Sequence, residues 1–138
     1  MSEVILMDTG PLVALYDVRD PWNEWATAQM RLLPAEVTTC EPVLTEACFL
    51  LARGRTDPTR ILRAVRQGTL KPAFEIGDEA AALETLMARY ADTPMSLADA
   101  CLVRLAELHK DCRVFTLDRH FARYRRYGRS VIPLLSPW

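Results

Sequence analysis

The sequence predicts an α/β protein, a three-layer α/β/α sandwich with a mostly parallel central sheet. Two observations favour this class. Short apolar segments of strand length alternate with longer segments that have helical periodicity. Helical segments also separate nearly every pair of strands, and such crossover connections join parallel strands. The length of 138 residues fits one domain spanning residues 1–138.

The first expected strand is the apolar run at residues 3–7, which ends in an Asp-Thr-Gly-Pro turn. Pro11 suits the first turn of a helix, because its φ angle is already helical and its missing N–H needs no partner there. A second helix begins near Asp20 and carries apolar residues at helical spacing until Pro34 ends it. A short strand is then expected at residues 37–39.

Two further helices are expected in the middle of the chain. The first, at residues 42–53, begins with a proline and ends before a glycine. The second, at residues 58–68, places apolar residues inward and arginines outward. The apolar segment 73–76 is expected as a brief strand, and a helix capped by its first residue follows at residues 78–90.

The last third of the chain contains the clearest helical pattern, at residues 97–108. An apolar strand follows at residues 113–116, with a turn at Asp118. A final strand is expected near residues 131–134. We find no internal repeat, low-complexity tract or linker in the sequence.

The composition is that of an ordinary globular domain. Half of the residues are hydrophobic and a quarter are charged, a balance that excludes a disordered chain. No apolar run approaches the ~20 residues that a membrane span needs. The N-terminal segment carries Glu3 and lacks a basic start and a small-residue cleavage site, so no secretory signal is readable. We therefore expect a cytoplasmic protein with no membrane contact.

The four cysteines show no Cys-x-x-Cys spacing. Cys48 and Cys101 lie inside apolar helical patterns, where a free thiol behaves as a small hydrophobic side chain. We expect reduced thiols in the core and neither a disulfide framework nor a zinc site. The four residues are Cys40, Cys48, Cys101 and Cys112.

Four acids stand where a parallel sheet gathers its ligands. Asp8 ends the first strand, and Asp118 follows the strand at residues 113–116. Glu46 has apolar neighbours one helical turn away, which places it on or beside the buried face of its helix. Asp99 interrupts an otherwise uncharged stretch. Because ligands bind at the carboxyl ends of parallel strands, we expect all four side chains to point into one crevice.

Each acid also has an ordinary structural explanation. Asp8 can bond the backbone of the turn that follows it, and Asp118 can cap a short helix. Ser96 and Asp99 fit a helix capping box. Glu46 can pair with a base on its own helix. These explanations are the commoner ones for any single acid, but the convergence of four favours a functional site.

A cluster of four carboxylates needs a counter-charge, because like charges raise one another's pKa and destabilise the fold. No lysine or arginine stands next to these acids on the expected strands. Carboxylate oxygens without nearby Cys or His suit Mg²⁺ or Mn²⁺ better than Zn²⁺. Three hydroxyl groups could orient the acids, those of Thr9, Ser96 and Thr116. Each of these residues, taken alone, is more typical of a helix cap or a turn.

Four segments together resemble the PIN-domain ribonucleases, and most closely the VapC-type toxins of bacterial toxin-antitoxin pairs. The resemblance covers essentially the whole chain in the right order, and its third segment is the most specific. The segments are Met7–Leu12 (MDTGPL), Thr45–Ala47 (TEA), Tyr90–Ala100 (YADTPMSLADA) and Phe115–Phe121 (FTLDRHF).

The resemblance implies a metal-dependent endoribonuclease that acts on single-stranded or looped RNA. It further implies a homodimer and a small antitoxin protein that blocks the site. Two positions depart from the family pattern, since Ser96 and His120 stand where many relatives carry acids. The four acids are unaffected, but whether the site holds one metal ion or two stays open. The resemblance also implies that four acids are the catalytic residues and the ligands of Mg²⁺ or Mn²⁺, namely Asp8, Glu46, Asp99 and Asp118.

Bases cluster in two stretches of the chain. Residues 53–71 carry six bases and one acid, and residues 119–129 carry five arginines and no acid. Either run, taken alone, is more often a solvated surface than a nucleic-acid contact. The second run begins beside Asp118 and could hold the RNA backbone. Its candidate RNA-binding residues are Arg119, Arg123, Arg125, Arg126 and Arg129.

Two other functions stay open at this point. A PIN-like module could bind RNA or protein without cleaving, but the presence of all four acids argues against it. The chain could also be another metal-dependent phosphoryl hydrolase. An Asp-x-Asp nucleophile motif beginning at Asp8 would favour that function, but Gly10 stands where the second aspartate would be. A phosphoacceptor switch domain is disfavoured because no lysine follows a late strand.

Overall fold

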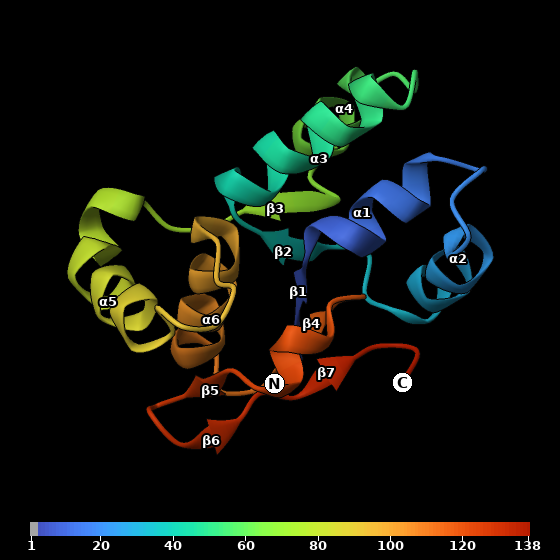
Figure 1. The fold of residues 1–138 in the computed structure, drawn as a ribbon. Coiled ribbons are helices and arrows are strands. Elements are labelled where there is room, and N and C mark those ends of the chain that lie inside the picture. Colours follow the sequence, from blue (N-terminus) through green and yellow to red (C-terminus); the bar gives the residue numbers. More distant parts are fainter. Residues whose placement is uncertain (1–2) are drawn as a thin grey trace.

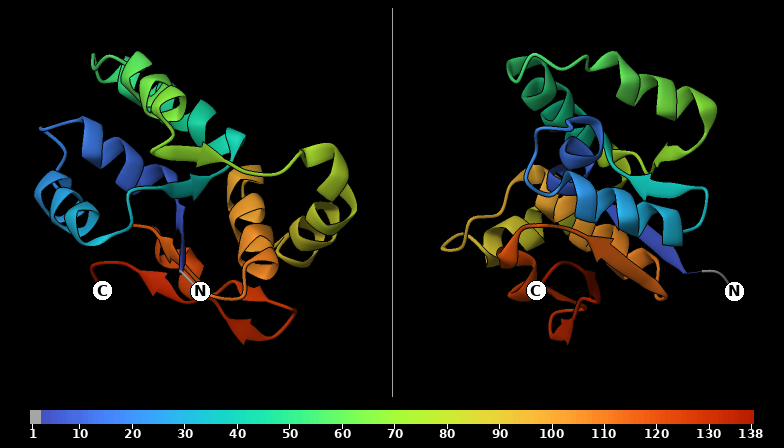
Figure 2. Two further views of the ribbon diagram at one scale, coloured as in Figure 1. Left: turned by 180° about the vertical axis from the view of Figure 1, so that it is seen from behind. Right: turned by 90° about the vertical axis from the view of Figure 1, so that its right-hand side faces the viewer.

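The computed structural model describes residues 3–138 and confirms the predicted α/β/α class (Figure 1). Helices α5 and α6 lie on one side of the central sheet and α1 and α2 on the other, and α3 and α4 lie together at one end of it (Figures 1 and 2). The elements are β1 (Val4–Met7), α1 (Thr9–Tyr16), α2 (Asn23–Leu32), β2 (Val37–Thr39), α3 (Glu41–Arg53), α4 (Thr59–Gln67), β3 (Leu70–Pro72), α5 (Ile76–Arg89), α6 (Leu97–Leu108), β4 (Cys112–Phe115), the 3₁₀ helix η1 (Arg119–Ala122), β5 (Arg125–Arg126), β6 (Ser130–Val131) and β7 (Leu134–Leu135).

The sheet has the strand order β3-β2-β1-β4-β7, and all its neighbouring strands are parallel. Strand β1 lies at the centre because it is apolar on both faces: Ile5, Leu6 and Met7 are all buried. Helix α6 packs on β1 and β4 and is itself buried around most of its circumference. The core therefore surrounds β1 and β4, the two strands after which the predicted site acids Asp8 and Asp118 stand.

The chain changes direction in the sheet between β1 and β4. From β1 it proceeds outward to β2 and β3, and then returns to β4 on the other side of β1. Such a switch point leaves a crevice at the carboxyl ends of the two strands. Met7 pairs with Phe115 in register, and the backbone N–H of Asp8 donates to the carbonyl of Phe115 at 2.9 Å. Asp8 and Thr116 thus leave the sheet side by side.

The strand expected at residues 73–76 was placed wrongly. The structure has β3 three residues earlier, where it pairs with β2 from Val37 opposite Leu70 onward. Phe74 has a positive φ of 38° and packs on the core from a loop, so the apolar character of this segment does not indicate a strand. Helix α5 also begins earlier than expected, at Ile76.

The single strand expected near residues 131–134 was also wrong. The structure splits this segment at Pro133, whose carbonyl accepts a hydrogen bond from Val114 N–H at 2.9 Å. Before the break, β6 pairs antiparallel with β5, in a hairpin that turns at Gly128 with φ of 80°. After the break, β7 pairs parallel with β4. A proline cannot donate a ladder hydrogen bond, which explains the interruption.

The cysteines are free thiols, and three of them are buried: Cys40, Cys101 and Cys112. This placement fits the predicted packing role. Among residues 3–138, no helix is long and apolar enough to cross a membrane.

The β5–β6 hairpin is fastened to the end of α6. The guanidinium of Arg126 donates to the carbonyls of Ala106 at 2.9 Å and His109 at 3.4 Å. The carboxylate of Glu107 accepts the backbone N–H of Tyr127 at 2.8 Å. Carbonyls in the last turn of a helix lack partners within the helix, so Arg126 supplies donors that α6 needs.

We expect Arg126→Ala to lower the free energy of unfolding by about 1–3 kcal/mol, because it removes the donors from half-buried carbonyls. Arg123 is exposed in the same arginine-rich run, and Arg123→Ala is the matched control, with an expected change within about 0.5 kcal/mol. Urea denaturation of both variants measures the difference. Equal stability of the two variants would contradict the structural role of Arg126.

Candidate active site

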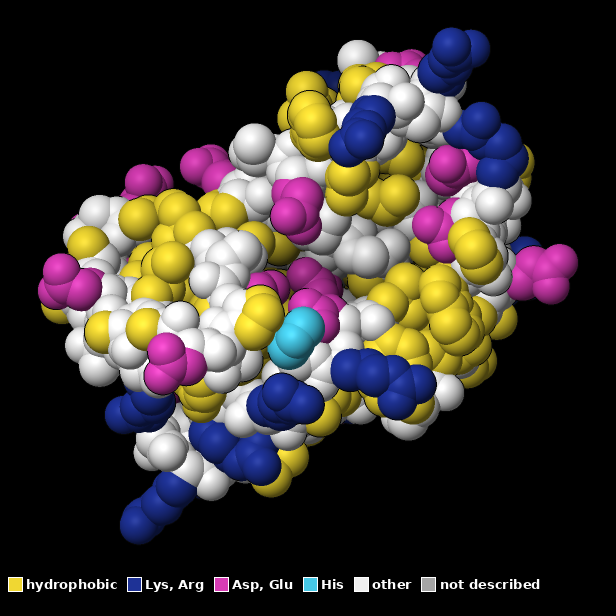
Figure 3. All heavy atoms as spheres, in the orientation of Figure 1, with side chains coloured by type: hydrophobic (Ala, Val, Ile, Leu, Met, Phe, Trp, Pro, Cys, Tyr) yellow, Lys and Arg dark blue, Asp and Glu magenta, His cyan; other side chains and the backbone are white. Residues whose placement is uncertain are grey.

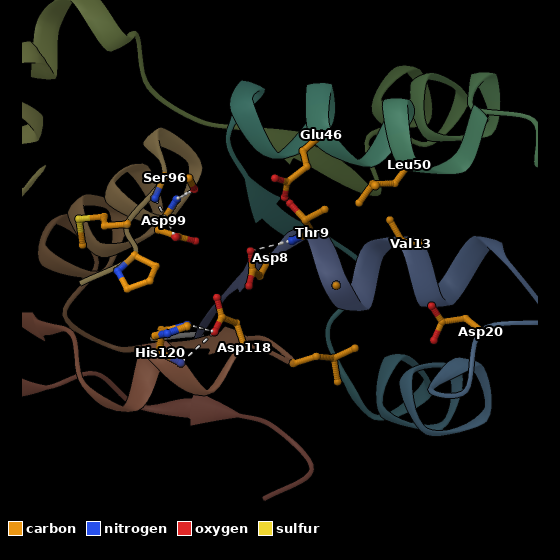
Figure 4. A pocket seen from close by; sticks show the side chains of 14 residues that line it. Asp8, Thr9, Val13, Asp20, Glu46, Leu50, Ser96, Asp99, Asp118 and His120 are labelled. Atoms are coloured by element: carbon orange, nitrogen blue, oxygen red, sulfur yellow. Dashed lines mark hydrogen bonds and ion pairs between the residues drawn. The ribbon is translucent and has the colours of Figure 1, made fainter. Parts of the chain in front are cut away.

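A crevice of about 640 Å³ opens at the carboxyl ends of β1 and β4. All four acids predicted from the sequence line it, and Figure 4 shows their carboxylates directed at one common space. The space-filling view shows acidic side chains in the same hollow (Figure 3). None of the described residues that line it is a lysine or arginine. The acids are Asp8 after β1, Glu46 on α3, Asp99 on α6 and Asp118 after β4.

Asp8 forms the floor of the crevice and is only 6% exposed. Its Oδ1 accepts the backbone N–H of Thr9 at 2.8 Å, and its Oδ2 accepts the hydroxyl of Thr116 at 2.6 Å. Burial raises the pKa of Asp8 from 3.8 to about 7, against the effect of these two hydrogen bonds. The charges of Asp99 and Asp118 add to the rise. The acids are therefore close enough to repel one another.

The hydroxyl of Thr116 connects two of the acids. It donates to Asp8, and its oxygen accepts the backbone N–H of Asp118 at 2.9 Å. Thr9 contributes in a different way: its Oγ1 lies buried at the crevice and has no hydrogen-bond partner in the described part of the chain. A buried polar atom without a partner usually marks a place for a water, an ion or a ligand.

Asp99 forms the helix capping box that the sequence predicted, and it also faces the crevice. Its N–H donates to the Ser96 hydroxyl at 3.1 Å and its Oδ2 accepts the Ser96 N–H at 3.0 Å, which is the expected capping box. The same side chain faces the crevice. Burial is the main cause that raises the pKa of Asp99, and the charges of Asp118 and Glu46 also contribute. Capping thus holds this carboxylate at the crevice.

Asp118 is the N-cap of η1, as its alternative explanation predicted. Its Oδ1 accepts the backbone N–H of His120 at 2.9 Å and lies 2.8 Å from the His120 Nδ1. Glu46 is exposed, and it lies beside the buried face of α3 rather than on it. Its apolar neighbours Phe49 and Leu50 are themselves 62% and 39% exposed, which the sequence pattern did not indicate. No ion pair between Glu46 and Arg53 is present in residues 3–138.

Sequence reasoning missed three side chains of this region. His120 lines the crevice, and its position two residues after Asp118 was noted only as a departure from the family pattern. Asp20 lines the far end of the crevice from the α1–α2 loop. Tyr124 is buried, donates its hydroxyl to the Pro94 carbonyl and lies 3.4 Å from Asp99 Oδ2. It has no sequence signal, because it follows a 3₁₀ turn and belongs to no periodic segment.

The arginines of residues 119–129 fall into two groups in the structure, those bonded to the protein's own carbonyls and those exposed to solvent. Arg126 is held against the end of α6, and Arg125 donates to the Ala122 and Tyr124 carbonyls. Arg119 and Arg123 are exposed, as is Arg129. No arginine of this run lines the crevice itself.

The residues of the crevice fit a hard divalent cation by type and charge. Oxygen donors predominate, no base offsets them, and Thr9 Oγ1 stands buried without a partner. Within residues 3–138, no three Asp, Glu, His or Cys side chains are already arranged to hold one ion. Asp8, Asp99 and Asp118 each accept a local backbone hydrogen bond while facing the crevice, so that metal binding would draw their carboxylates closer together.

Comparisons with known proteins agree with this architecture. Ribonuclease VapC26 of Mycobacterium tuberculosis strain H37Rv is 28% identical over 136 residues, which cover 94% of this chain and 100% of that protein. The crystal structure of VapC20 from M. tuberculosis, described as a sarcin-ricin loop cleaving toxin, matches with a TM-score of 0.77 at 21% identity. That match covers 94% of this chain and 99% of VapC20, and it shows the shared fold.

A sequence model of the PIN domain matches residues 5–127, a range that includes all four crevice acids. The match spans most of the chain and agrees with the parallel sheet, the switch point between β1 and β4 and the acidic crevice above it. The chain therefore belongs to the PIN-domain family.

Proposed function

We propose that this protein is a metal-dependent endoribonuclease that hydrolyses RNA phosphodiester bonds in the cytoplasm, as the toxin of a toxin-antitoxin pair. The observation that carries the proposal is the acidic crevice, into which four carboxylates from different elements project with no lysine or arginine among the lining residues. The names of the relatives support it, since VapC26 is called a ribonuclease and VapC20 a sarcin-ricin loop cleaving toxin. Mg²⁺ or Mn²⁺ is the ion that these donors favour.

A bound ion would polarise the scissile phosphate and lower the pKa of a water that attacks it. Asp8, Asp99 and Asp118 would hold the ion from three different elements. Thr116 fixes the position of Asp8 and the backbone of Asp118 at once, and the Ser96 cap fixes Asp99. Glu46 is the most accessible of the four acids and can turn toward a bound water or the substrate.

Protein partners are also part of the proposal, namely a cognate antitoxin and a second copy of the chain. A groove of about 680 Å³ adjoins the crevice and shares Glu46 with it. It is lined by exposed apolar side chains of three helices: Phe49, Ile76 and Leu97. Contiguous exposed apolar surface of this kind marks protein interaction sites. A partner seated there would stand directly at the entrance of the crevice.

We expect purified protein to cleave single-stranded RNA in Mg²⁺ or Mn²⁺ and to lose this activity in EDTA. Asp8→Asn and Asp99→Asn should each reduce the cleavage rate at least ~100-fold, because each removes a charged metal ligand. The matched control is Asp78→Asn, which changes an exposed acid in the first turn of α5 and should cleave normally. Gel-based cleavage assays of the three variants measure the cleavage rates. Full activity of the wild type in EDTA would exclude the metal mechanism.

The stability of the metal-free protein should depend on pH through Asp8. Its pKa of about 7 in the folded protein exceeds its ordinary value of 3.8, so the folded state takes up a proton first as pH falls. Ionised Asp8 therefore destabilises the fold above about pH 7, and acidification relieves this by up to about 1.4 kcal/mol per pH unit. Melting temperatures in EDTA should rise from about pH 8 to about pH 5.5. Asp8→Asn should flatten the profile, and an unchanged profile in that variant would refute the assignment.

Mg²⁺ should stabilise the folded protein, because only the folded state assembles the acids. The expected gain is ~2.7 kcal/mol when the metal concentration is 100 times its Kd. Asp99→Asn should lose most of the Mg²⁺-induced rise in melting temperature, whereas Asp78→Asn should keep it. Both variants remove an acidic charge from the first turn of a helix, so the comparison separates a general charge effect from metal binding. Equal Mg²⁺ shifts in both variants would argue against the acid cluster as the metal site.

A further inference from the structure

Three tryptophans form an aromatic cluster on the side of the molecule where the α1–α2 loop meets the C-terminal segment. The ring centroids of Trp22 and Trp25 are 6.1 Å apart, and those of Trp22 and Trp138 are 6.3 Å apart, both in edge-to-face geometry. Trp25 is in turn edge-on to Phe115 of β4 at 5.5 Å. The cluster is therefore anchored in the core through Trp25, and Trp22 and Trp138 form its outer part.

The outer part of this cluster is open to solvent. Trp22 is 38% exposed and Trp138 is 43% exposed. Tryptophan is usually well buried, and two adjacent exposed indoles leave an apolar surface whose contact with water is unfavourable. Such rings have a π face that suits stacking by a planar ligand.

A positive charge lies on this surface. The guanidinium carbon of Arg119 is 4.5 Å from the centroid of the Trp138 ring, a cation–π contact that fixes the arginine over the indole. Arg119 is exposed and makes no ion pair within the described part of the chain. The surface formed by Trp22, Trp138 and Arg119, which we term the stacking platform, thus combines aromatic faces with an available cation.

The stacking platform borders the acidic crevice. Arg119 directly follows the crevice acid Asp118 in the chain. Asp20 lines the opposite part of the crevice, and its carboxylate accepts the backbone N–H of Trp22 at 2.8 Å. In Figure 3, apolar surface crossed by a basic side chain adjoins the acidic hollow. A nucleotide chain with one phosphate in the crevice would therefore reach the platform with its neighbouring bases.

We propose that the stacking platform binds unpaired bases of an RNA strand beside the scissile phosphate, with Trp22 and Trp138 stacking on bases and Arg119 contacting the backbone. Single-stranded RNA is recognised by stacking on aromatic rings and arginine planes, together with positive charge along the backbone. Duplex RNA hides its base faces and cannot use the platform. The inference rests on the proposed function, since it takes the crevice as the site of cleavage, and it adds the surface that would hold the bases next to the scissile phosphate.

The test measures binding in EDTA, so that no cleavage occurs. The probes are a fluorescently labelled single-stranded RNA of mixed sequence and the same strand annealed to its complement. Trp22→Leu and Trp138→Leu should weaken binding of the single strand roughly 5- to 100-fold, the range expected for loss of one base–aromatic stack. Trp138→Phe should restore part of the affinity, because it keeps an aromatic face. Binding of the duplex should be unchanged in all three variants.

Arg119→Ala should act through charge as well as stacking. We expect it to lower the slope of log affinity against log salt concentration by about one contact, whereas Trp138→Leu should leave that slope unchanged. The matched controls are Leu62→Ala, an exposed apolar residue of α4, and Arg66→Ala, an exposed arginine of the same helix. Both should bind the single-stranded probe like the wild type, and melting temperatures confirm that each variant is folded.

The outcomes separate this inference from the proposed function. Wild-type affinity in both Trp→Leu variants, with RNA cleavage in Mg²⁺ intact, overturns the platform and leaves the nuclease standing. Selective loss of single-strand binding in a protein that cleaves no RNA supports the platform and overturns the nuclease. Unchanged RNA binding with an altered oligomeric state of Trp138→Leu in sedimentation assigns the surface to a protein interface and overturns the proposal. Failure of the wild type to bind either probe also overturns it.

Discussion

The hydrogen bond from Thr116 to Asp8 joins the two central strands at the point on which the candidate site depends. Parallel pairing of β1 with β4 sets Met7 opposite Phe115, so that the next residue of each strand leaves the sheet together. One hydroxyl then donates to Asp8 and accepts the backbone N–H of Asp118. A buried carboxylate is costly unless it is hydrogen-bonded, and here the sheet register itself supplies the bond. A one-residue slip would remove it and would turn both acids away from the crevice.

Structural and functional explanations of the acids prove to be compatible in this fold. Asp99 closes a capping box with Ser96, and Asp118 caps η1 through the N–H of His120. Each cap stabilises its helix start by roughly 0.5–2 kcal/mol, which offsets part of the repulsion between the gathered charges. The same bonds restrict where each carboxylate can lie. A residue can therefore look like an ordinary cap in the sequence and still be placed, by that cap, at the site.

The parts of this structure that the sequence could predict are those with a long or repeated signal. Alternating strands and helices indicate the parallel sheet, and acids at the strand ends indicate the crevice. Strands β5, β6 and β7 have two residues each, which is too short for any periodicity to show. The role of Arg126 depends on carbonyls about 20 residues away in the sequence, and that of Tyr124 on a carbonyl 30 residues away. Such contacts exist only once the tertiary fold is formed.

The sign of the charges constrains how RNA can approach. The crevice acids and a phosphodiester backbone repel each other, so affinity has to come from the surfaces beside the crevice, and a bound cation would add to it. At physiological salt a charge acts over about 8 Å. Arg119, next to Asp118, can therefore attract a phosphate near the crevice, whereas the bases of α4 contribute little. On the other side the crevice meets the apolar groove of Phe49, Ile76 and Leu97. The entrance is thus asymmetric, with a basic aromatic edge suited to RNA and an apolar edge suited to protein.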